Sequence, residues 1–405
     1  MSEALRGIPR AGTSFGGRIA ERVAIHALAG LRHGALELRL PNGAVHRAGS
    51  GEPVVVTVES NDLFRRLARS PRIGLGESYV AGDWHTDDLP GLVALVIRNV
   101  ELWRRDSRLA RVERFRPHFT PRQSPRKARR NIRYHYDLGN NFYRLFLDES
   151  MTYSSAVWEP GDTLEQAQER KLRMICDKLA LGPGDHVLEI GCGWGSFALM
   201  AAGEYGARVT GVTISREQLE LARSRVAAAG LANRVEILFQ DYRTLEGQFT
   251  KIASIEMLEA VGYSQYPTFL AACDRLLARG GLVAIQVIGM PDQRFERYRR
   301  KEDWIQRYIF PGSLLPSLEV LQTTMSRSSE LIVIGLEEIG PHYADTLHDW
   351  RDRFFARLPE VRRLGFDEQF VRTWDFYLAS CEALFRTRAI RDMQLVLGRP
   401  FEEPA

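Results

Sequence analysis

One run of residues has the composition and spacing of a ligand-binding turn. Residues 187–195 read Val-Leu-Glu-Ile-Gly-Cys-Gly-Trp-Gly, a buried-strand pattern followed by three glycines at alternate positions. Glycines let the backbone turn tightly beside a ligand, and a helix beginning near Ser196 would point its N–H groups at that ligand. The dinucleotide spacing G-x-G-x-x-G is absent, and an acid, Glu189, lies inside the strand. The run therefore predicts a cofactor site and argues against a nicotinamide cofactor.

This run resembles motif I of the class I methyltransferases, which use S-adenosylmethionine (SAM). That motif combines an acid within the strand with alternate glycines in the turn. The resemblance implies SAM as the cofactor and four residues that bind it: Glu189, Gly191, Gly193 and Gly195.

Polar residues after the next two predicted strands extend the cofactor site. The second strand lacks the terminal acid that commonly holds ribose hydroxyls, so Thr213 and Gln218 are the candidates there. Both residue types are also common at an ordinary helix N-terminus. Asp241 and Tyr242 follow the third strand, where class I enzymes recognise adenine, and Asp241 would accept from its amine.

Strand and helix patterns alternate around the glycine run. This order predicts an α/β fold, a doubly wound, Rossmann-like parallel sheet that binds its ligand at the carboxyl ends of the strands. Beyond residue 290 we expect mostly helix, including 343–397, and we expect a turn at 280–281. The expected strands are 186–190, 208–213, 235–239, 251–256 and 282–287, and the expected helices are 164–180, 196–205, 216–229 and 266–277.

The first quarter of the chain has a different pattern. It predicts a small α+β domain at 1–110, followed by a basic linker at 111–130 and a catalytic domain at 131–405. Residues 104–130 carry eleven Arg or Lys against two acids. In the first domain the expected helices are 19–31, 61–68 and 92–103, and the expected strands are 35–40 and 54–58, with a turn at 41–43.

Composition limits the class of protein. Of 405 residues, 44% are apolar, which is ample for a packed core, yet apolar runs stop at about seven residues and exclude a membrane span. The start lacks a hydrophobic signal region. Four cysteines without close spacing argue against a zinc site or disulfides, so we expect no metal and a cytoplasmic location.

Several further segments match one family. The chain resembles the cyclopropane-fatty-acyl-phospholipid synthases, which are related to the mycolic acid cyclopropane synthases. Residues 76–84 resemble the N-terminal domain of the bacterial phospholipid enzymes. Besides the glycine run, the matching segments are 134–143, 151–158, 211–218, 240–243, 257–262 and 308–316.

The resemblance implies a particular reaction. The π electrons of a cis double bond in a phospholipid acyl chain attack the methyl group of SAM. The resulting carbocation loses a proton from the new methyl group and closes to a cyclopropane. In this family a bound bicarbonate ion is the base, held by a Glu, a His, a Tyr and the backbone of a Cys and an Ile.

Carried over by position, the bicarbonate ligands are Glu259, Tyr343 and the backbone of Ile288. Ser155 stands at the Cys position, which changes little because the contact is through the backbone. Gln286 stands at the His position, and an amide cannot titrate near neutral pH. Ring closure is therefore open to an alternative: loss of a chain proton instead, which would leave a methylene- or methyl-branched acyl product.

Other residues carry roles by resemblance alone. Tyr153 and Ser154 correspond to residues that touch the SAM carboxylate and cover its sulfonium. His135, Tyr136 and Tyr308 are candidates for the wall of the acyl pocket, although core packing explains them equally well.

Basic and aromatic residues suggest how such an enzyme reaches a lipid. The linker and residues 294–307 would adsorb to an anionic membrane surface, which predicts a peripheral protein on the inner face of the membrane and no nucleic-acid partner. The bacterial relatives imply a homodimer. The rival hypothesis is a non-catalytic relative that binds lipid or nucleic acid. The expected membrane-facing residues are Arg294, Arg297, Arg299, Arg300 and Trp304.

Overall fold

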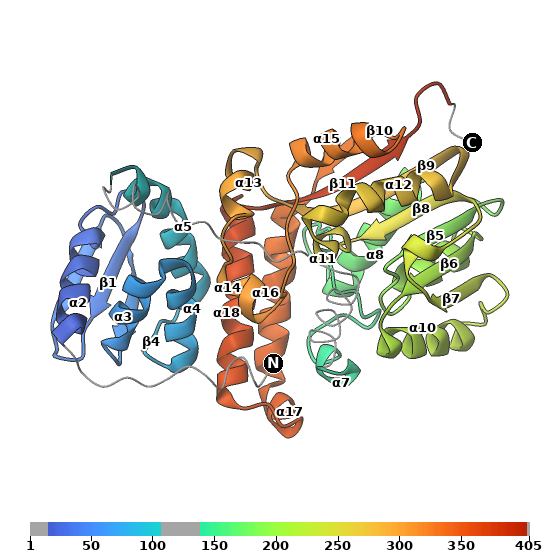
Figure 1. The fold of residues 1–405 in the computed structure, drawn as a ribbon. Helices are drawn as coiled ribbons and strands as arrows, with labels where there is room; N and C mark the ends of the chain where they lie inside the picture. The colour runs from blue at the N-terminus through green and yellow to red at the C-terminus, as the bar shows by residue number, and fades with distance from the viewer. Residues whose placement is uncertain (1–14, 107–137, 403–405) are drawn as a thin grey trace. The chain divides into compact units, whose positions relative to one another are not determined.

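The computed structural model describes residues 15–106 and 138–402, and it divides into two compact units (Figure 1). Unit 1 comprises 1–120, 300–309 and 358–389, and unit 2 comprises 121–299, 310–357 and 390–405. The sequence placed 300–309 and 358–389 with the catalytic domain, whereas the structure packs them with the N-terminal elements. The basic linker at 111–130 lies outside the described residues.

Unit 1 contains a small four-stranded sheet in the order β2-β1-β3-β4. Strand β1 pairs antiparallel with β2 and parallel with β3, and its Ala35, Leu36 and Leu38 are buried. The expected α+β character is confirmed, and β2 and α4 are additions that the sequence did not predict. The elements are α2 (Phe15–Leu28), β1 (Ala35–Arg39), β2 (Val45–Gly49), β3 (Pro53–Val58), α3 (Asp62–Arg69), α4 (Pro71–Ala81), β4 (Trp84–His85) and α5 (Leu89–Asp106).

Three helices from the second half of the chain complete unit 1: α14 (Trp304–Tyr308), α17 (Leu358–Arg363) and α18 (Glu368–Arg386). Helix α18 packs against α4 and α5. Its Arg372 donates from Nε to the Tyr79 carbonyl (2.6 Å) and from Nη2 to the Trp84 carbonyl (2.9 Å). Tyr79 in turn donates its hydroxyl to Asp375. These contacts explain why residues so distant in sequence join the first unit.

Unit 2 is built on a seven-stranded sheet in the order β10-β11-β9-β8-β5-β6-β7. The five strands β5 to β9 run parallel, which confirms the doubly wound core. Strand β11 is antiparallel to both β9 and β10. The strands are β5 (His186–Ile190), β6 (Arg208–Thr213), β7 (Val235–Phe239), β8 (Phe249–Ile255), β9 (Leu277–Gly289), β10 (Ile332–Glu338) and β11 (Arg391–Gly398).

Two expectations in this region were wrong. Residues 391–397 form a strand instead of a helix, because Met393, Leu395 and Leu397 alternate into the core while the backbone pairs with β9. The expected turn at 280–281 is absent, since β9 runs through both glycines.

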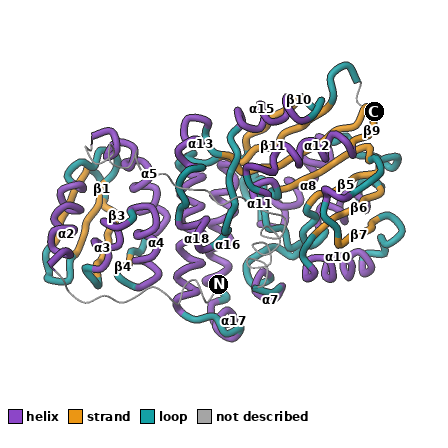
Figure 2. The backbone as a smooth tube through the Cα atoms, viewed as in Figure 1, coloured by secondary structure: helices purple, strands orange, loops and turns teal. Residues whose placement is uncertain are grey.

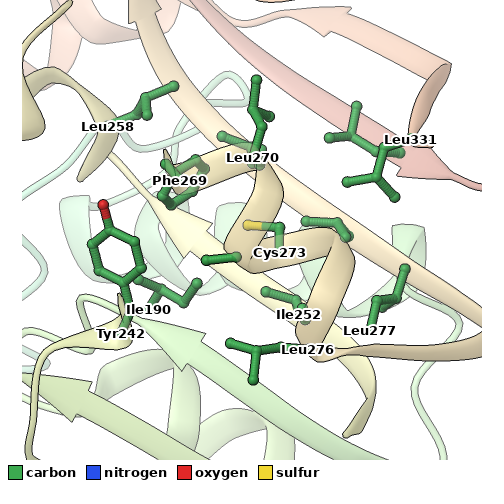
Figure 3. Packing of buried hydrophobic residues seen from close by; sticks show 14 of the residues in the cluster. Ile190, Tyr242, Ile252, Leu258, Phe269, Leu270, Cys273, Leu276, Leu277 and Leu331 are labelled. Carbon is green, nitrogen blue, oxygen red and sulfur yellow. The ribbon is translucent and has the colours of Figure 1, made fainter. Parts of the chain in front are cut away.

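Helices cover both faces of the large sheet (Figure 2). On one face α12 and α15 bury an apolar cluster that includes Phe269, Leu270 and Leu276 (Figure 3). On the other face α8, α9 and α10 bury a second cluster. No helix among the described residues has an apolar stretch long enough to cross a bilayer. The helices of unit 2 are α7 (Asn140–Tyr143), α8 (Leu164–Lys178), α9 (Ser196–Gly203), α10 (Arg216–Ala228), α11 (Leu258–Val261), α12 (Tyr266–Leu276), α13 (Asp292–Tyr298), α15 (Leu318–Ser328) and α16 (Gly340–Ala356).

Candidate active site

The glycine run forms the expected turn between β5 and α9. Gly191, Gly193 and Gly195 have φ values of 84°, 51° and 87°, in the left-handed region that residues with a Cβ rarely adopt. A Cβ at Gly191 would also lie 2.7 Å from Cγ of Met257. The backbone conformation and the close approach therefore both require glycine here.

A cavity of about 190 Å³ lies at the carboxyl ends of the parallel strands. Residues directly after β6, β7 and β8 border it, as the rule for open parallel sheets predicts. Gly195 is the one predicted cofactor residue that does not line it, because it forms the N-cap of α9. The predicted residues that do line it are Tyr153, Ser154, Glu189, Gly191, Gly193, Thr213, Gln218, Asp241 and Tyr242.

One part of this cavity is lined by polar side chains on the β6 and β7 side. The Thr213 hydroxyl donates to Oε1 of Gln218 (2.8 Å), so Gln218 offers its amide hydrogens to a ligand. Asp241 is oriented by Arg243, whose Nε lies 2.8 Å from Oδ1 and whose Nη2 lies 2.5 Å from Oδ2. The Tyr242 hydroxyl is buried without a partner among the described residues. These groups suit the hydroxyls and amine of a nucleoside.

Two buried ionisable groups, Glu189 and Lys171, line the cavity. Burial raises the pKa of Glu189 to about 8, against the charge of Lys171 and the N–H of Ala198, which lower it. Burial also lowers the pKa of Lys171 to about 8, and its Nζ donates to Oγ of Ser154 (2.6 Å). Oε2 of Glu189 has no partner among the described residues. The unpartnered polar atoms and the glycine turn fit SAM.

Aromatic side chains support the segment that carries Tyr153. The Tyr153 ring stacks on Trp350 of α16, with centroids 5.2 Å apart and an interplanar angle of 27°. Tyr143 meets it edge-on at 5.3 Å, and Phe146 packs against both Tyr153 and Trp350. This packing fixes the backbone of residues 153–155 beside the cavity.

Glu256 is a further candidate functional residue, which the sequence pattern predicted only as the end of a strand. Its Oε1 accepts from the backbone N–H of Ser155 and from Nε2 of Gln286, each at 2.8 Å. Its Oε2 accepts from the hydroxyl of Tyr343 at 2.7 Å. Glu256 borders the cavity and is half-buried, and desolvation raises its pKa. Its position at the carboxyl end of β8 was the available signal.

The backbone of Glu256 is held in an unfavourable conformation. Its φ is 48°, which costs a residue with a Cβ roughly 1–3 kcal/mol unless the surroundings fix it. Here the Glu256 N–H donates to the Gln286 carbonyl (2.8 Å), and three donors hold the side chain. Such strain at a residue facing a cavity is typical of a functional site.

Glu259 lies behind Glu256 and does not border the cavity. Its Oε1 accepts from the N–H of Ile288 (2.5 Å), whereas its Oε2 is buried without a partner among the described residues. Burial, followed by the charge of Glu256, raises its pKa to about 8.

The groups expected to hold bicarbonate are thus brought together, but their donors are already engaged. Ser155, Gln286 and Tyr343 bind Glu256, and the N–H of Ile288 binds Glu259. A bicarbonate ion would have to displace one of the chain's own carboxylates. The residues present therefore do not fit this ion.

The predicted pocket-wall and membrane-facing residues lie elsewhere or are only partly exposed. His135 and Tyr136 fall outside the described residues. Tyr308 belongs to unit 1, where its hydroxyl donates to Glu77 (2.6 Å). Trp304 is only 3% exposed and packs against Tyr308 and Phe376, so the expectation that it faces a membrane was wrong.

The expected arginines around α13 are on or near the surface. Arg300 is exposed, whereas Arg294, Arg297 and Arg299 are half-buried. Arg299 pairs with Glu296 and lies over the ring of Tyr263 at 5.3 Å.

Solved structures share the fold of about two thirds of this chain. The cyclopropane synthase MmaA2 from Mycobacterium tuberculosis matches with a TM-score of 0.62 and 28% identity, covering 67% of this chain and 98% of that one. Mycolic acid cyclopropane synthase CmaA1, solved with SAH and CTAB, matches with a TM-score of 0.61 and 30% identity, covering 66% and 97%. The parallel sheet, the glycine turn and the cavity beside it define a class I SAM-dependent methyltransferase.

Sequence comparison gives the family. A family model described as mycolic acid cyclopropane synthetase matches residues 123–395. Tuberculostearic acid methyltransferase UfaA1 of Mycobacterium tuberculosis is 42% identical over 381 residues, 91% of this chain and 86% of that protein. The cyclopropane-fatty-acyl-phospholipid synthase of Escherichia coli K12 is 38% identical over 380 residues, 90% and 94%. The chain belongs to the mycolic acid cyclopropane synthetase family and is a SAM-dependent C-methyltransferase.

Proposed function

We propose that this enzyme methylates a double-bond carbon in the acyl chain of an unsaturated phospholipid, with Glu256 as the general base. The observation that carries the proposal is the Glu256 carboxylate, held by Ser155, Gln286 and Tyr343 at the wall of the cofactor cavity. The names of the two relatives, a tuberculostearic acid methyltransferase and a cyclopropane-fatty-acyl-phospholipid synthase, support a lipid acyl chain as the substrate.

The chemistry divides between cofactor and protein. When bound, SAM supplies an electrophilic methyl group. As the π electrons of the double bond form the new C–C bond, the bond between that methyl group and the sulfur would break with its electron pair left on sulfur, and the neighbouring chain carbon would be left as a cation. That cation must lose one proton, and an oxygen of Glu256 accepts it. The electron pair of the broken C–H bond then forms either the third side of a ring or a new double bond.

Glu256 has the features that a general base needs. Burial raises its pKa towards the working pH, which strengthens it as a base, while its three donors and the charge of Lys171 favour the ionised form. Because it is part of the chain, the base is present whenever the enzyme is folded. It replaces the bicarbonate ion that the resemblance implied.

Two products of equal mass are compatible with this site. The cyclopropane ring is the product implied by the resemblance. The branched product is the second candidate, favoured by Gln286 at the family's His position and by a base that belongs to the chain. The 42% identical relative is also named as a methyltransferase.

Access to the lipid is proposed to occur at an anionic membrane surface. Arg300 and the half-buried arginines of α13 supply positive charge, and Tyr263 is 45% exposed beneath Arg299. Each basic residue near such a surface contributes about 1 kcal/mol. The homodimer stays a prediction.

The test is the product formed in a host that lacks its own synthase. Mass spectrometry of phospholipid acyl chains should show a gain of about 14 Da with the wild-type chain and none with Glu256→Gln. A chemical test for the double bond separates the ring, which lacks one, from the branched chain, which retains one. Unchanged acyl chains with a folded, SAM-binding protein would exclude the proposed function.

A further inference from the structure

A row of polar side chains connects the surface of α8 to Glu256, the proposed base. Lys178 donates from Nζ to Oε1 of Gln394, and Gln394 donates from Nε2 to Oε1 of Gln286 (3.1 Å). Gln286 then donates from Nε2 to Glu256 (2.8 Å) and to Oδ2 of Asp392 (3.0 Å). All five residues belong to unit 2, and Gln394 and Gln286 are direct partners across β11 and β9.

The first member of this row fixes its direction. An ammonium group can only donate hydrogen bonds, so the group of Gln394 that faces Lys178 must be its carbonyl oxygen. The amide nitrogen of Gln394 then faces Gln286 and must meet the carbonyl oxygen there. The amide nitrogen of Gln286 is left to face the two carboxyl groups.

Reversal of Gln286 would be costly at this depth. Gln286, Asp392 and Gln394 are at most 2% exposed. A flipped Gln286 would set its carbonyl oxygen against two carboxyl groups and would set two amide nitrogens against each other. Buried polar groups without partners are expensive.

We propose that Lys178 and Gln394 are positioning residues that lock the amide of Gln286 and thereby keep Glu256 ionised and ready to accept a proton. This inference rests on the proposed role of Glu256. It also accounts for Gln286 at the family's His position. Its amide nitrogen donates to two carboxyl groups at once, while its carbonyl oxygen accepts from Gln394.

The charged and titratable groups around Glu256 come from every element packed on it. Lys171 of α8 lowers the pKa of Glu256, as do the donors on Ser155 and Tyr343. Burial, followed by the neighbouring carboxyl groups of Glu256 and Glu259, raises the pKa of Asp392 of β11. Loss of the Gln286 donor therefore removes one of the few groups that favour the ionised base.

The experiment is the pH dependence of methyl transfer from labelled SAM to vesicles of dioleoylphosphatidylglycerol. The variant Lys178→Met removes the leading donor, and Gln394→Glu replaces the donating amide with an isosteric acceptor. In both we expect turnover at neutral pH to fall several-fold and its acid limb to move up by about one pH unit, because Glu256 loses a donor to its charged form. SAM affinity should not change.

Two matched variants separate this effect from simple surface changes. Lys178→Arg keeps a donor-only cation and should restore the wild-type profile. Glu337→Gln removes the surface ion pair of Lys178 (2.6 Å) without touching the row and should leave the profile unchanged.

The outcomes also separate the two proposals. If Glu256→Gln is inactive and both Lys178→Met and Gln394→Glu keep the wild-type pH profile, the proposed positioning role is wrong. The proposed role of Glu256 as the base is then unaffected. If Glu256→Gln retains turnover, the proposed function itself fails. A lowered melting temperature with an unmoved acid limb would reduce the row to a structural element.

Discussion

A tyrosine hydroxyl that donates to a carboxyl group is found in both units, and two of these pairs, one from each unit, have different surroundings. In unit 1, Tyr79 of α4 donates to Asp375 of α18. In unit 2, Tyr343 of α16 donates to Glu256 at the end of β8. The first pair joins two helices, whereas the second borders the cofactor cavity.

The surroundings of each pair decide its role. Tyr79 is enclosed by Trp84, Phe376 and the guanidinium of Arg372, with centroid distances of 5.0, 5.8 and 4.2 Å. Packing of this kind stabilises an interface between helices. Glu256 instead accepts from three donors, sits in a strained backbone and faces a cavity. A tyrosine–carboxyl pair thus acquires a chemical role only where a ligand can reach it.

The largest difference should follow from isosteric removal of each acid. Glu256→Gln should lower turnover by about 100- to 10,000-fold, the usual range for loss of a general base, with little change in melting temperature. Asp375→Asn should leave the turnover of folded enzyme unchanged and lower stability by about 1 kcal/mol. Steady-state rates and urea unfolding measure both, and a Glu256→Gln enzyme that is merely unstable would contradict the comparison.

Removal of the two tyrosine hydroxyls should give smaller effects. As with the acids, the change in unit 2 should affect turnover and the change in unit 1 should affect stability. A hydrogen bond to a charged group contributes about 1.5–3 kcal/mol, so Tyr343→Phe should lower turnover at least about tenfold at neutral pH. The loss should shrink as the pH rises, because Glu256 regains its ionised form. Tyr79→Phe should cost stability alone. Equal loss of turnover in both variants would show that the two pairs have the same role.

The buried neighbour of the base should appear in the pH dependence of stability. The pKa of Glu259 is raised to about 8 in the fold, so between about pH 4.5 and 8 the unfolded chain releases this proton and the folded chain keeps it. Stability therefore falls as the pH rises through this window, by at most about 1.4 kcal/mol per unit for this group. Glu259→Gln, measured by unfolding at pH 6 and pH 7.5 without SAM, should flatten the slope. If the pH dependence of stability in the variant has the same slope as in the wild type, Glu259 is not the group that holds this proton.

The smallest expected effect concerns bicarbonate. With Glu256 and Glu259 occupying the donors expected for the ion, turnover in buffer purged of carbon dioxide should change by less than about twofold. Added bicarbonate should also fail to rescue Glu256→Gln. If the wild-type enzyme requires bicarbonate, the assignment of Glu256 as the base is contradicted.

Much of the fold followed from local patterns. Strands β5, β6 and β7 begin and end at the residues predicted from the alternating strand and helix patterns. The errors lie where tertiary pairing overrides local signals: β9 continues through Gly280 and Gly281, and β11 forms from a segment expected to be helical. In each case the strand is stabilised by its partners in the sheet, which no local pattern records.

The sequence by itself determined the cofactor half of the site, because its glycines and polar residues follow one another along three strand ends and their roles depend on local backbone geometry. Only the tertiary structure points to the proposed base. The carboxylate of Glu256 accepts hydrogen bonds from residues 155, 286 and 343. These three donors lie far from one another in sequence and meet only in the folded chain. Burial among the segments that carry these donors raises the pKa of Glu256, which strengthens it as a base, and this is a property of the assembled fold.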